Sequence, residues 1–146
     1  MKRVLPVSIV PATPTLCGRL IAHVSEEDNE DMVRGWGVSS AHAIMTHYAL
    51  YKPSYIVMHG NEPMLIFGCC GDGALWMMRG DHMEAISIRF IYRAKKYLDE
   101  WLDKYKYLVC EFWGENKKLK RYMKWCGFTS TDLDNGYVRC EKWAQQ

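Results

Sequence analysis

A chain of 146 residues with 49% hydrophobic content is long enough for one domain with a substantial core and too short for two ordinary domains. Its formal net charge of +2 gives no overall reason to expect a nucleic-acid partner. No apolar run approaches the roughly eighteen residues of a membrane-spanning helix, and Pro6, Ser8 and Pro11 interrupt the apolar stretch that a signal peptide would need.

The first third of the chain predicts one strand followed by three helices. The β-branched content of residues 3–10 favours a strand that Pro11 and Pro14 end, and residues 15–23 then suggest a short helix. Ser25 starts a second helix whose early turns carry acidic side chains, which the helix dipole favours, and Gly35 and Gly37 end it. The third helix covers residues 39–51, with His42, Met45 and Ala49 among its expected inward-facing residues.

Three antiparallel strands are expected next. Residues 54–59 and 64–70 form a hairpin around the turn at residues 60–62, because β-branched and apolar residues flank a Gly-containing turn. Gly71-Asp72-Gly73 makes a second turn into a strand at residues 74–78.

The stretch from Ala85 to Phe128 predicts a long helix, a buried strand and a short basic helix. Apolar residues recur at three- and four-residue spacings up to Tyr105, and Asp81 with Glu84 forms a capping box before them. Residues 107–113 have the β-branched and aromatic content of a buried strand. A helix over 116–126 then ends at Gly127, where a left-handed residue is needed, and two strands flank the turn at residues 134–136.

The six cysteines show no Cys-x-x-Cys spacing, and the five histidines form no helical pair, so no metal site is predicted. We expect reduced thiols that act as small buried hydrophobes. Cys69 and Cys70 are neighbours on a strand, so their side chains point to opposite faces and do not form a joint metal site.

A basic run marks the last helix. Its members are Lys117, Lys118, Lys120, Arg121 and Lys124. Such a run is usually a solvated helix face, and the alternative is that it holds the phosphates of a coenzyme or an acidic partner surface.

These elements resemble a known superfamily. Asn116, followed eleven positions later by Gly127-Phe128 on a helix behind a strand and a long helix, resembles the strand 5 to helix 4 half of the GNAT acyltransferases. Within that superfamily the chain resembles the small GNAT-like proteins of podoviruses, related to their small internal virion proteins. Residues 62–68, 71–73 and 75–78 with Gly80-Asp81 are similar to the central strands of that group, residues 116–128 are similar to its final helix and turn, and the resemblance spans residues 25–143.

The resemblance implies an α/β (α+β) class and a single GNAT-like domain over residues 1–146. The expected sheet is mixed and mostly antiparallel, with about seven strands, a parallel pair formed across the long helix, and helices on both faces.

The resemblance also implies acetyl-CoA as the ligand. In such proteins the pantetheine pairs with the edge of strand 4, which is splayed from strand 5, and the pyrophosphate lies on N–H groups at the next helix start. The corresponding residues here are Met78, Arg79, Gly80, Asp81 and His82. They depart from the family signature, since only Gly80 permits close backbone approach and the Asp81 carboxylate opposes an anion, although Arg79 can meet a phosphate.

The expected catalytic residues are also incomplete. Many relatives carry a tyrosine seven residues after the asparagine as general acid, and this chain has Met123 there, with Tyr122 about 100° around the helix. Glu111 and His82 are the remaining candidates for the base that deprotonates an amine substrate. Glu111 is equally consistent with an ordinary strand residue that faces solvent. Asn116 either contacts the coenzyme or caps its helix.

The early helices border the acceptor cleft in this superfamily. The resemblance therefore implies that Trp36, His42 and His47 line that cleft. The residues themselves favour the simpler interpretation, in which the aromatic packs on a helix end and the two histidines are partly exposed.

Three functions stay open. The first is acetyl-CoA-dependent N-acyl transfer to, or coenzyme A binding against, a host protein or metabolite. The second is a non-catalytic phage protein that acts in virion assembly or binds a host protein. The third, nucleic-acid binding through the basic helix, is disfavoured by the low net charge. The implied location is the host cytoplasm or the virion interior, with no membrane partner. The sequence leaves the oligomeric state undecided, with a homodimer as one alternative.

Overall fold

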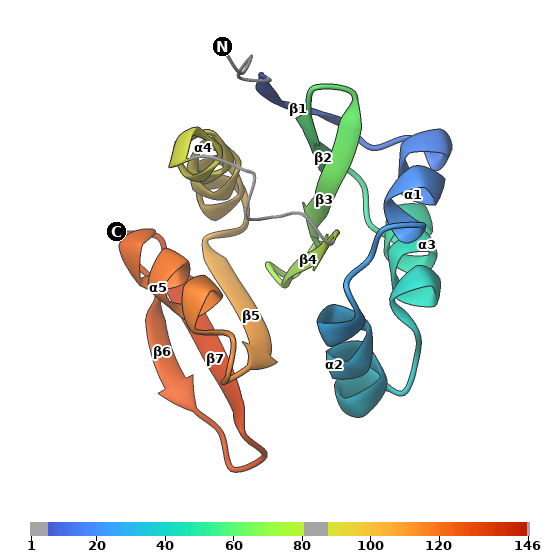
Figure 1. The fold of residues 1–146 in the computed structure, drawn as a ribbon. Coiled ribbons are helices and arrows are strands. Elements are labelled where there is room, and N and C mark those ends of the chain that lie inside the picture. The colour runs from blue at the N-terminus through green and yellow to red at the C-terminus, as the bar shows by residue number, and fades with distance from the viewer. Residues whose placement is uncertain (1–5, 81–87, 146) are drawn as a thin grey trace. The chain divides into compact units, whose positions relative to one another are not determined.

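The computed structural model describes residues 6–80 and 88–145, which form five helices and seven strands (Figure 1). In chain order they are β1 Val7–Pro11, α1 Pro14–Ile21, α2 Glu26–Trp36, α3 Ser40–Leu50, β2 Ser54–His59, β3 Glu62–Cys69, β4 Leu75–Arg79, α4 Ile88–Tyr105, β5 Tyr107–Trp113, α5 Lys117–Trp125, β6 Thr129–Asp132 and β7 Tyr137–Trp143. No helix within the described ranges is both long enough and apolar enough to span a bilayer.

The strands form two antiparallel sheets, which confirms the predicted fold class. One sheet has the order β1-β2-β3-β4 and the other the order β5-β7-β6. The expected parallel pair is limited to one bridge, between Ala74 and Val109. The seven strands therefore form a four-stranded sheet and a three-stranded sheet, and not the one continuous sheet that was expected.

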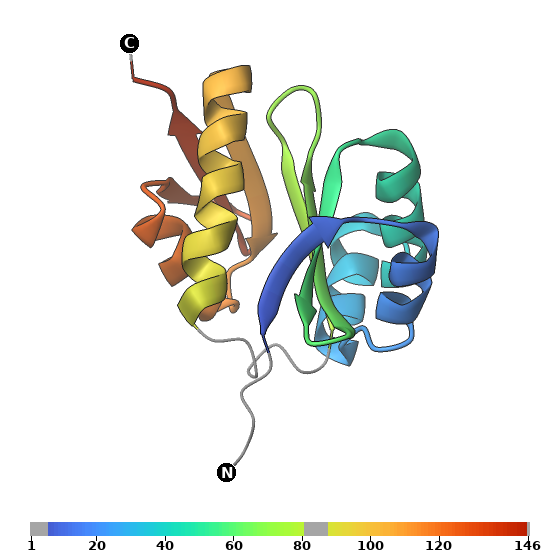
Figure 2. The same ribbon diagram turned by 90° about the horizontal axis from the view of Figure 1, so that it is seen from above.

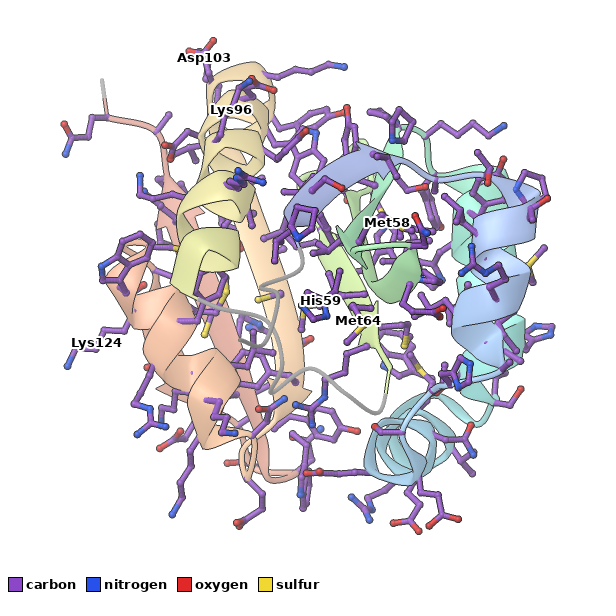
Figure 3. The ribbon with its side chains drawn as sticks, turned by 45° about the horizontal axis from the view of Figure 1, so that its top comes forward. Met58, His59, Met64, Lys96, Asp103 and Lys124 are labelled. Atoms are coloured by element: carbon purple, nitrogen blue, oxygen red, sulfur yellow. The ribbon has the colours of Figure 1, made fainter. Side chains whose placement is uncertain are left out.

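The chain folds into two compact units, Met1–Gly68 with Met77–Arg93 and Cys69–Trp76 with Ala94–Gln146. In the first unit, α1, α2 and α3 lie on one side of the β1-β2-β3 strands (Figure 2). Figure 3 labels Met58 and Met64 on the paired strands β2 and β3, and both side chains are buried. The fully buried core side chains of this unit include Leu20, Ile44, Ile56, Leu65 and Ile66.

The predicted inward face of α3 was wrong. His42, Met45 and Ala49 are exposed, whereas Ser40, Ala43 and Ile44 are buried. Apolar residues occur all around this helix, so their periodicity does not mark one face.

Two helix starts are set by local side chains. The Thr13 side chain accepts a hydrogen bond from the Leu16 N–H at 3.2 Å, and Pro14 begins α1. Pro14 thus starts this helix, since its fixed φ suits the first turn. Ser39 caps α3 in the same way, through the His42 N–H at 3.2 Å.

The second unit packs α5 and the 94–105 part of α4 against the three-stranded sheet (Figure 2). Its buried side chains include Trp101, Leu108, Met123, Phe128 and Val138. The predicted capping box of Asp81 and Glu84 lies outside the described residues, as do residues 85–87 at the predicted start of the long helix.

β5 is a half-buried edge strand and not the buried strand predicted from its composition. Of its seven residues only Leu108 is buried. β5 pairs along its length with β7 alone, and the side chain of Glu111 points to the more open face of the sheet, where it meets Arg139 at 3.1 Å. Apolar composition predicted a strand correctly but not its place at an edge.

The C-terminus of α5 forms a Schellman motif. The Gly127 N–H donates to the Lys124 carbonyl and the Phe128 N–H to the Met123 carbonyl, each at 3.0 Å. Gly127 has a φ of +93°, which confirms the predicted left-handed conformation. Phe128 and Met123 are both buried, so the motif also supplies the apolar contact that usually accompanies it.

Replacement of Gly127 by valine should lower the free energy of unfolding by about 1 kcal/mol or more, because a β-branched residue is strained at positive φ. Gly127→Asn is the matched control, since asparagine tolerates this conformation and should retain most of the stability. Denaturant unfolding of both variants measures the difference, and equal midpoints for Gly127→Val and the parent would contradict the assignment.

Candidate functional site

The beginnings of β4 and β5 meet at a close backbone contact inside the second unit. The Val109 N–H donates to the Gly73 carbonyl at 3.0 Å, next to the parallel bridge between Ala74 and Val109. Gly73 has a φ of +92°, and a Cβ at this position would overlap the Tyr107 carbonyl oxygen. Glycine is required here because the φ angle is positive and because no space is left for a Cβ.

A tight turn sets the Gly73 backbone. The Gly73 N–H donates to the Cys70 carbonyl at 2.9 Å, and the Cys70 N–H donates to the Ala74 carbonyl at 2.8 Å. The Asp72 side chain accepts from the Ala74 N–H at 3.1 Å. The Gly-Asp-Gly sequence therefore does more than reverse the chain, because it delivers β4 to the contact with β5.

Each of these two strands keeps one edge outside the ladders of its own sheet. β4 is the terminal strand of the four-stranded sheet, and β5 is the terminal strand of the three-stranded sheet. Apart from the Ala74–Val109 bridge, no further strand in the described residues pairs with these edges. A strand edge offers alternating N–H and C=O groups to an extended amide-containing ligand.

Of the residues expected to hold the coenzyme, Met78 and Arg79 end β4. Met78 is buried, so its side chain belongs to the core. The Arg79 side chain is 22% exposed and lies 3.5 Å from the Glu27 carboxylate of α2. Asp81 and His82 lie outside the described residues.

Gly80 is held by the backbone of the first unit. It bridges Val24, and its N–H donates to the Met64 carbonyl at 2.7 Å. A Cβ at Gly80 would lie 3.1 Å from the His23 carbonyl oxygen. The backbone that approaches Gly80 closely is therefore that of His23. The Gly80 N–H already donates to Met64, so it is not available to a phosphate.

Asn116 begins α5. Its side-chain oxygen accepts a hydrogen bond from the Leu119 N–H at 3.3 Å. The oxygen of the amide is therefore engaged as an N-cap, and the NH₂ group is the part of this side chain that can serve a ligand acceptor.

The two residues expected to transfer protons lie on different elements. Glu111 is on β5 and accepts from Arg139 at 3.1 Å across the β5–β7 pair. Tyr122 is on α5, stacked on Trp125 with ring centroids 6.3 Å apart. Burial and the neighbouring Cys126 thiol raise the pKa of the Tyr122 phenol far above its usual range. A phenol with a raised pKa is a poorer proton donor to a leaving thiolate.

Met123, at the position where the resemblance implied a general acid, is buried in the core of the second unit. A polar group there would enter an apolar environment.

The residues expected along the acceptor cleft are not brought together into one site by any described contact. Trp36 is 69% exposed at the end of α2, and His42 is exposed on α3. The His47 Nδ1 lies 2.8 Å from the Ala43 carbonyl oxygen of its own helix, and its ring packs on Tyr51.

The basic run forms one exposed face of α5. Lys117, Lys118, Arg121 and Lys124 are exposed, whereas Lys120 is half-buried and pairs with Asp132 at 3.6 Å. Figure 3 shows the labelled Lys124 side chain extending away from α5. A solvated face explains this placement without a ligand.

All six cysteines are free thiols, and the described residues contain no group of three or more His, Cys, Asp or Glu side chains that could hold a metal ion.

No protein-family model and no curated protein matches the sequence. Solved structures match the fold over nearly the whole chain. The GNAT domain of S. lividans PAT superposes with a TM-score of 0.68 at 15% identity, covering 94% of this chain and 90% of that one. An acetyltransferase from Thermus thermophilus gives a TM-score of 0.66 at 15% identity, with 98% and 100% covered.

A third similar structure carries a ligand. The aminoglycoside acetyltransferase AAC(6')-Ib, in complex with coenzyme A, gives a TM-score of 0.61 at 13% identity and covers 96% of each chain. At these identities the likeness establishes the fold alone. The chain has the GNAT fold.

Sequence reasoning missed three features of this region. The Gly73 contact with β5 was signalled only as a turn, although a Gly-Asp-Gly run before a strand also suits close backbone approach. The Arg79–Glu27 pair joins residues 52 positions apart, and no local pattern predicts it. The register that places Cys110 opposite Cys140 was also missed.

Gly73→Ala should destabilise the protein by more than about 2 kcal/mol, because it adds positive-φ strain to an overlap with a backbone oxygen that cannot rotate away. Gly71→Ala in the same turn is the control, since its Cβ would meet nothing within 4 Å. That control should stay within about 0.5 kcal/mol of the parent in denaturant unfolding. Similar losses for both variants would contradict the close contact.

Proposed function

We propose that this chain binds an acyl-coenzyme A and transfers its acetyl group to an amine of a host protein or metabolite, as a phage product acting in the host cytoplasm. The observation that carries the proposal is the GNAT fold over nearly the whole chain, shared with acetyltransferases that include a coenzyme A complex. The chain acts as one GNAT-like domain in this proposal.

The edge of β4 suits the pantetheine arm. This arm contains two amide groups, and the backbone groups along the outer edge of a terminal strand pair with such amides as a further strand would. The contact at Gly73 fixes where β4 begins, so this edge is presented in a defined register.

Arg79 supplies the positive charge for the phosphates. In the structure the Arg79 guanidinium lies 3.5 Å from the Glu27 carboxylate, and the Arg79 side chain is only partly exposed. A bound pyrophosphate would compete with Glu27 for this guanidinium. Because the Gly80 N–H is donated to Met64, the Arg79 side chain carries more of the phosphate recognition than in relatives with the full signature.

The transfer step forms a bond between the amine nitrogen and the thioester carbonyl carbon and breaks the carbon–sulfur bond. The amine loses one proton, and the coenzyme thiolate gains one. Glu111 fits the base, since carboxylates accept protons and its side chain lies on the more open face of its strand. Tyr122 is the candidate acid that returns a proton to the thiolate, although burial and the Cys126 thiol, which raise the pKa of its phenol, weaken it in that role.

The Met123 position favours a second candidate, a non-catalytic phage protein that uses the fold in virion assembly or to bind a host protein. A buried thioether stands where the resemblance implied a general acid, and a thioether has no proton to donate. In an enzyme without that acid, solvent would have to protonate the coenzyme thiolate. Binding and turnover measurements separate the two candidates.

Calorimetric titration with acetyl-CoA tests the binding site. Arg79→Ala should weaken binding on the order of tenfold or more, through loss of a charge-assisted hydrogen bond. Glu27→Gln should strengthen binding by up to about fivefold, since it removes the competing carboxylate. Glu26→Gln, an exposed neighbour on α2, is the matched control and should bind as the parent does.

The same titration examines Asp81. Asp81→Asn removes a carboxylate from the expected pyrophosphate position and should also strengthen binding. Absence of heat for the parent and for all variants would exclude the coenzyme site and leave the non-catalytic function.

Turnover with an amine acceptor tests the proton-transfer residues. Glu111→Gln should lower kcat on the order of a hundredfold while leaving the KM for acetyl-CoA near the parent value. Tyr122→Phe keeps the ring stack and should leave kcat within about threefold, because its phenol holds its proton too tightly to act. Arg139→Gln controls for loss of the Glu111 ion pair. A large loss of kcat in Tyr122→Phe, with unchanged stability, would contradict this expectation and show that the Tyr122 hydroxyl takes part in proton transfer.

A further inference from the structure

Two cysteines thirty residues apart in sequence face each other across the β5–β7 pair. Cys110 is the direct register partner of Cys140 in this antiparallel ladder. Directly opposite residues place their side chains on the same face of the sheet, so both thiols lie on the face that carries buried Leu108 and Val138.

The backbone bonds that flank the pair define its type. At one end the Gly114 N–H donates to the Gly136 carbonyl, and at the other the Ala144 N–H donates to the Lys106 carbonyl, both at 3.0 Å. Hydrogen-bonded pairs alternate along an antiparallel ladder, so the pair of Cys110 and Cys140 is of the hydrogen-bonded type. Its Cα atoms are then about 5.5 Å apart, within the range that a disulfide spans.

The two sulfur atoms already interact. The Cys110 thiol donates a hydrogen bond to the Cys140 sulfur, which raises the pKa of Cys110 and lowers the pKa of Cys140. The positive charge of Lys120 on α5 adds to the lowering at Cys140. Cys140 is 1% exposed, whereas Cys110 keeps a small part of its side chain exposed. The partly exposed thiol therefore lies directly against a buried one.

The other four cysteines lack this arrangement. Burial raises the pKa of Cys17 and of Cys126, and the Cys126 thiol interacts with Tyr122. Cys69 and Cys70 are sequence neighbours, and burial together with Cys70 and Asp72 raises the pKa of Cys69 to about 12. Among the described residues, only the β5–β7 register places two cysteines directly opposite.

We propose that Cys110 and Cys140 form a modification site at which a hydroperoxide produces a reversible cross-strand disulfide. The Cys110 sulfur attacks one peroxide oxygen and loses its thiol proton, the O–O bond breaks, and the leaving hydroxide takes that proton to give water, so that Cys110 becomes a sulfenic acid. The Cys140 sulfur then attacks the Cys110 sulfur and loses its thiol proton, the S–O bond breaks, and the leaving hydroxide takes that proton to give a second water. In total two thiols and one hydrogen peroxide give one disulfide and two waters.

Geometry predicts that this disulfide is easily reduced. Opposite Cβ atoms in an antiparallel pair lie about 4.5–5.5 Å apart, nearer the upper end for hydrogen-bonded pairs, whereas a disulfide needs about 3.5–4.5 Å. Closing that gap pulls β5 toward β7 and strains the bond, and strained disulfides are the labile ones. A reducing environment therefore keeps both thiols free, and oxidant exposure changes them.

The bond would enclose α5 and β6, since both elements lie between residues 110 and 140. A cross-link that closes this loop limits the unfolded chain, so oxidation should raise the melting temperature despite the strain.

The test treats the folded full chain with hydrogen peroxide after removal of reductant. Intact mass should fall by two hydrogens, peptide mapping should join the peptides of Cys110 and Cys140, the melting temperature should rise, and a dithiol should reverse all three changes. Cys110→Ala should abolish the loss of two hydrogens, whereas Cys70→Ala, another partly exposed thiol, should not.

A second variant tests the order of the steps without requiring the disulfide. In Cys140→Ala the sulfenic acid has no partner thiol, so dimedone should label Cys110. Loss of two hydrogens in Cys110→Ala, a mapped link between other cysteines, or further oxidation of Cys110 in the parent while Cys140 remains a thiol would overturn the proposal. None of these measurements depends on acetyl-CoA binding, so failure here is distinguishable from failure of the proposed function.

Discussion

The contact between the Gly73 backbone and β5 is the constraint on which the rest of the structure depends. The Gly73 carbonyl accepts from the Val109 N–H, at a position where a Cβ would overlap the Tyr107 carbonyl. It makes the one parallel bridge in the described strands. Because β4 otherwise pairs with β3 and β5 with β7, this contact leaves each strand with an edge outside its own ladder, and the proposed coenzyme binding needs the edge of β4.

Local chemistry explains what the sequence predicted well. Turn residues marked the β2–β3 and β6–β7 hairpins, Asn116 marked the start of α5, and Gly127 marked its end, because each of these signals acts within a few residues. Features that join distant residues could not be predicted in this way. The inward face of α3, the edge position of β5 and the Arg79–Glu27 pair all depend on neighbours that no local pattern specifies.

The differences from the coenzyme-binding and acid residues that the resemblance implied share one physical origin. Gly80 gives its N–H to Met64 and approaches His23, and Met123 lies in the core, so both positions serve the fold itself. In the proposed function, coenzyme recognition then depends on a strand edge and on one guanidinium whose carboxylate partner is exposed. Such a site exchanges an internal ion pair for a ligand, which lowers affinity relative to a preformed anion site but makes it adjustable by a single charge.

Three consecutive residues of β5 serve three different purposes, because side chains alternate across a strand. Val109 makes the bridge to Ala74, Cys110 faces Cys140 on the buried side, and Glu111 faces Arg139 on the more open side. A disulfide at the middle position would shorten the distance between β5 and β7 where the next residue holds its ion pair. The proposed oxidation at Cys110 and the proposed proton transfer at Glu111 would therefore act on the same stretch of the same ladder, where one peptide unit joins the two residues.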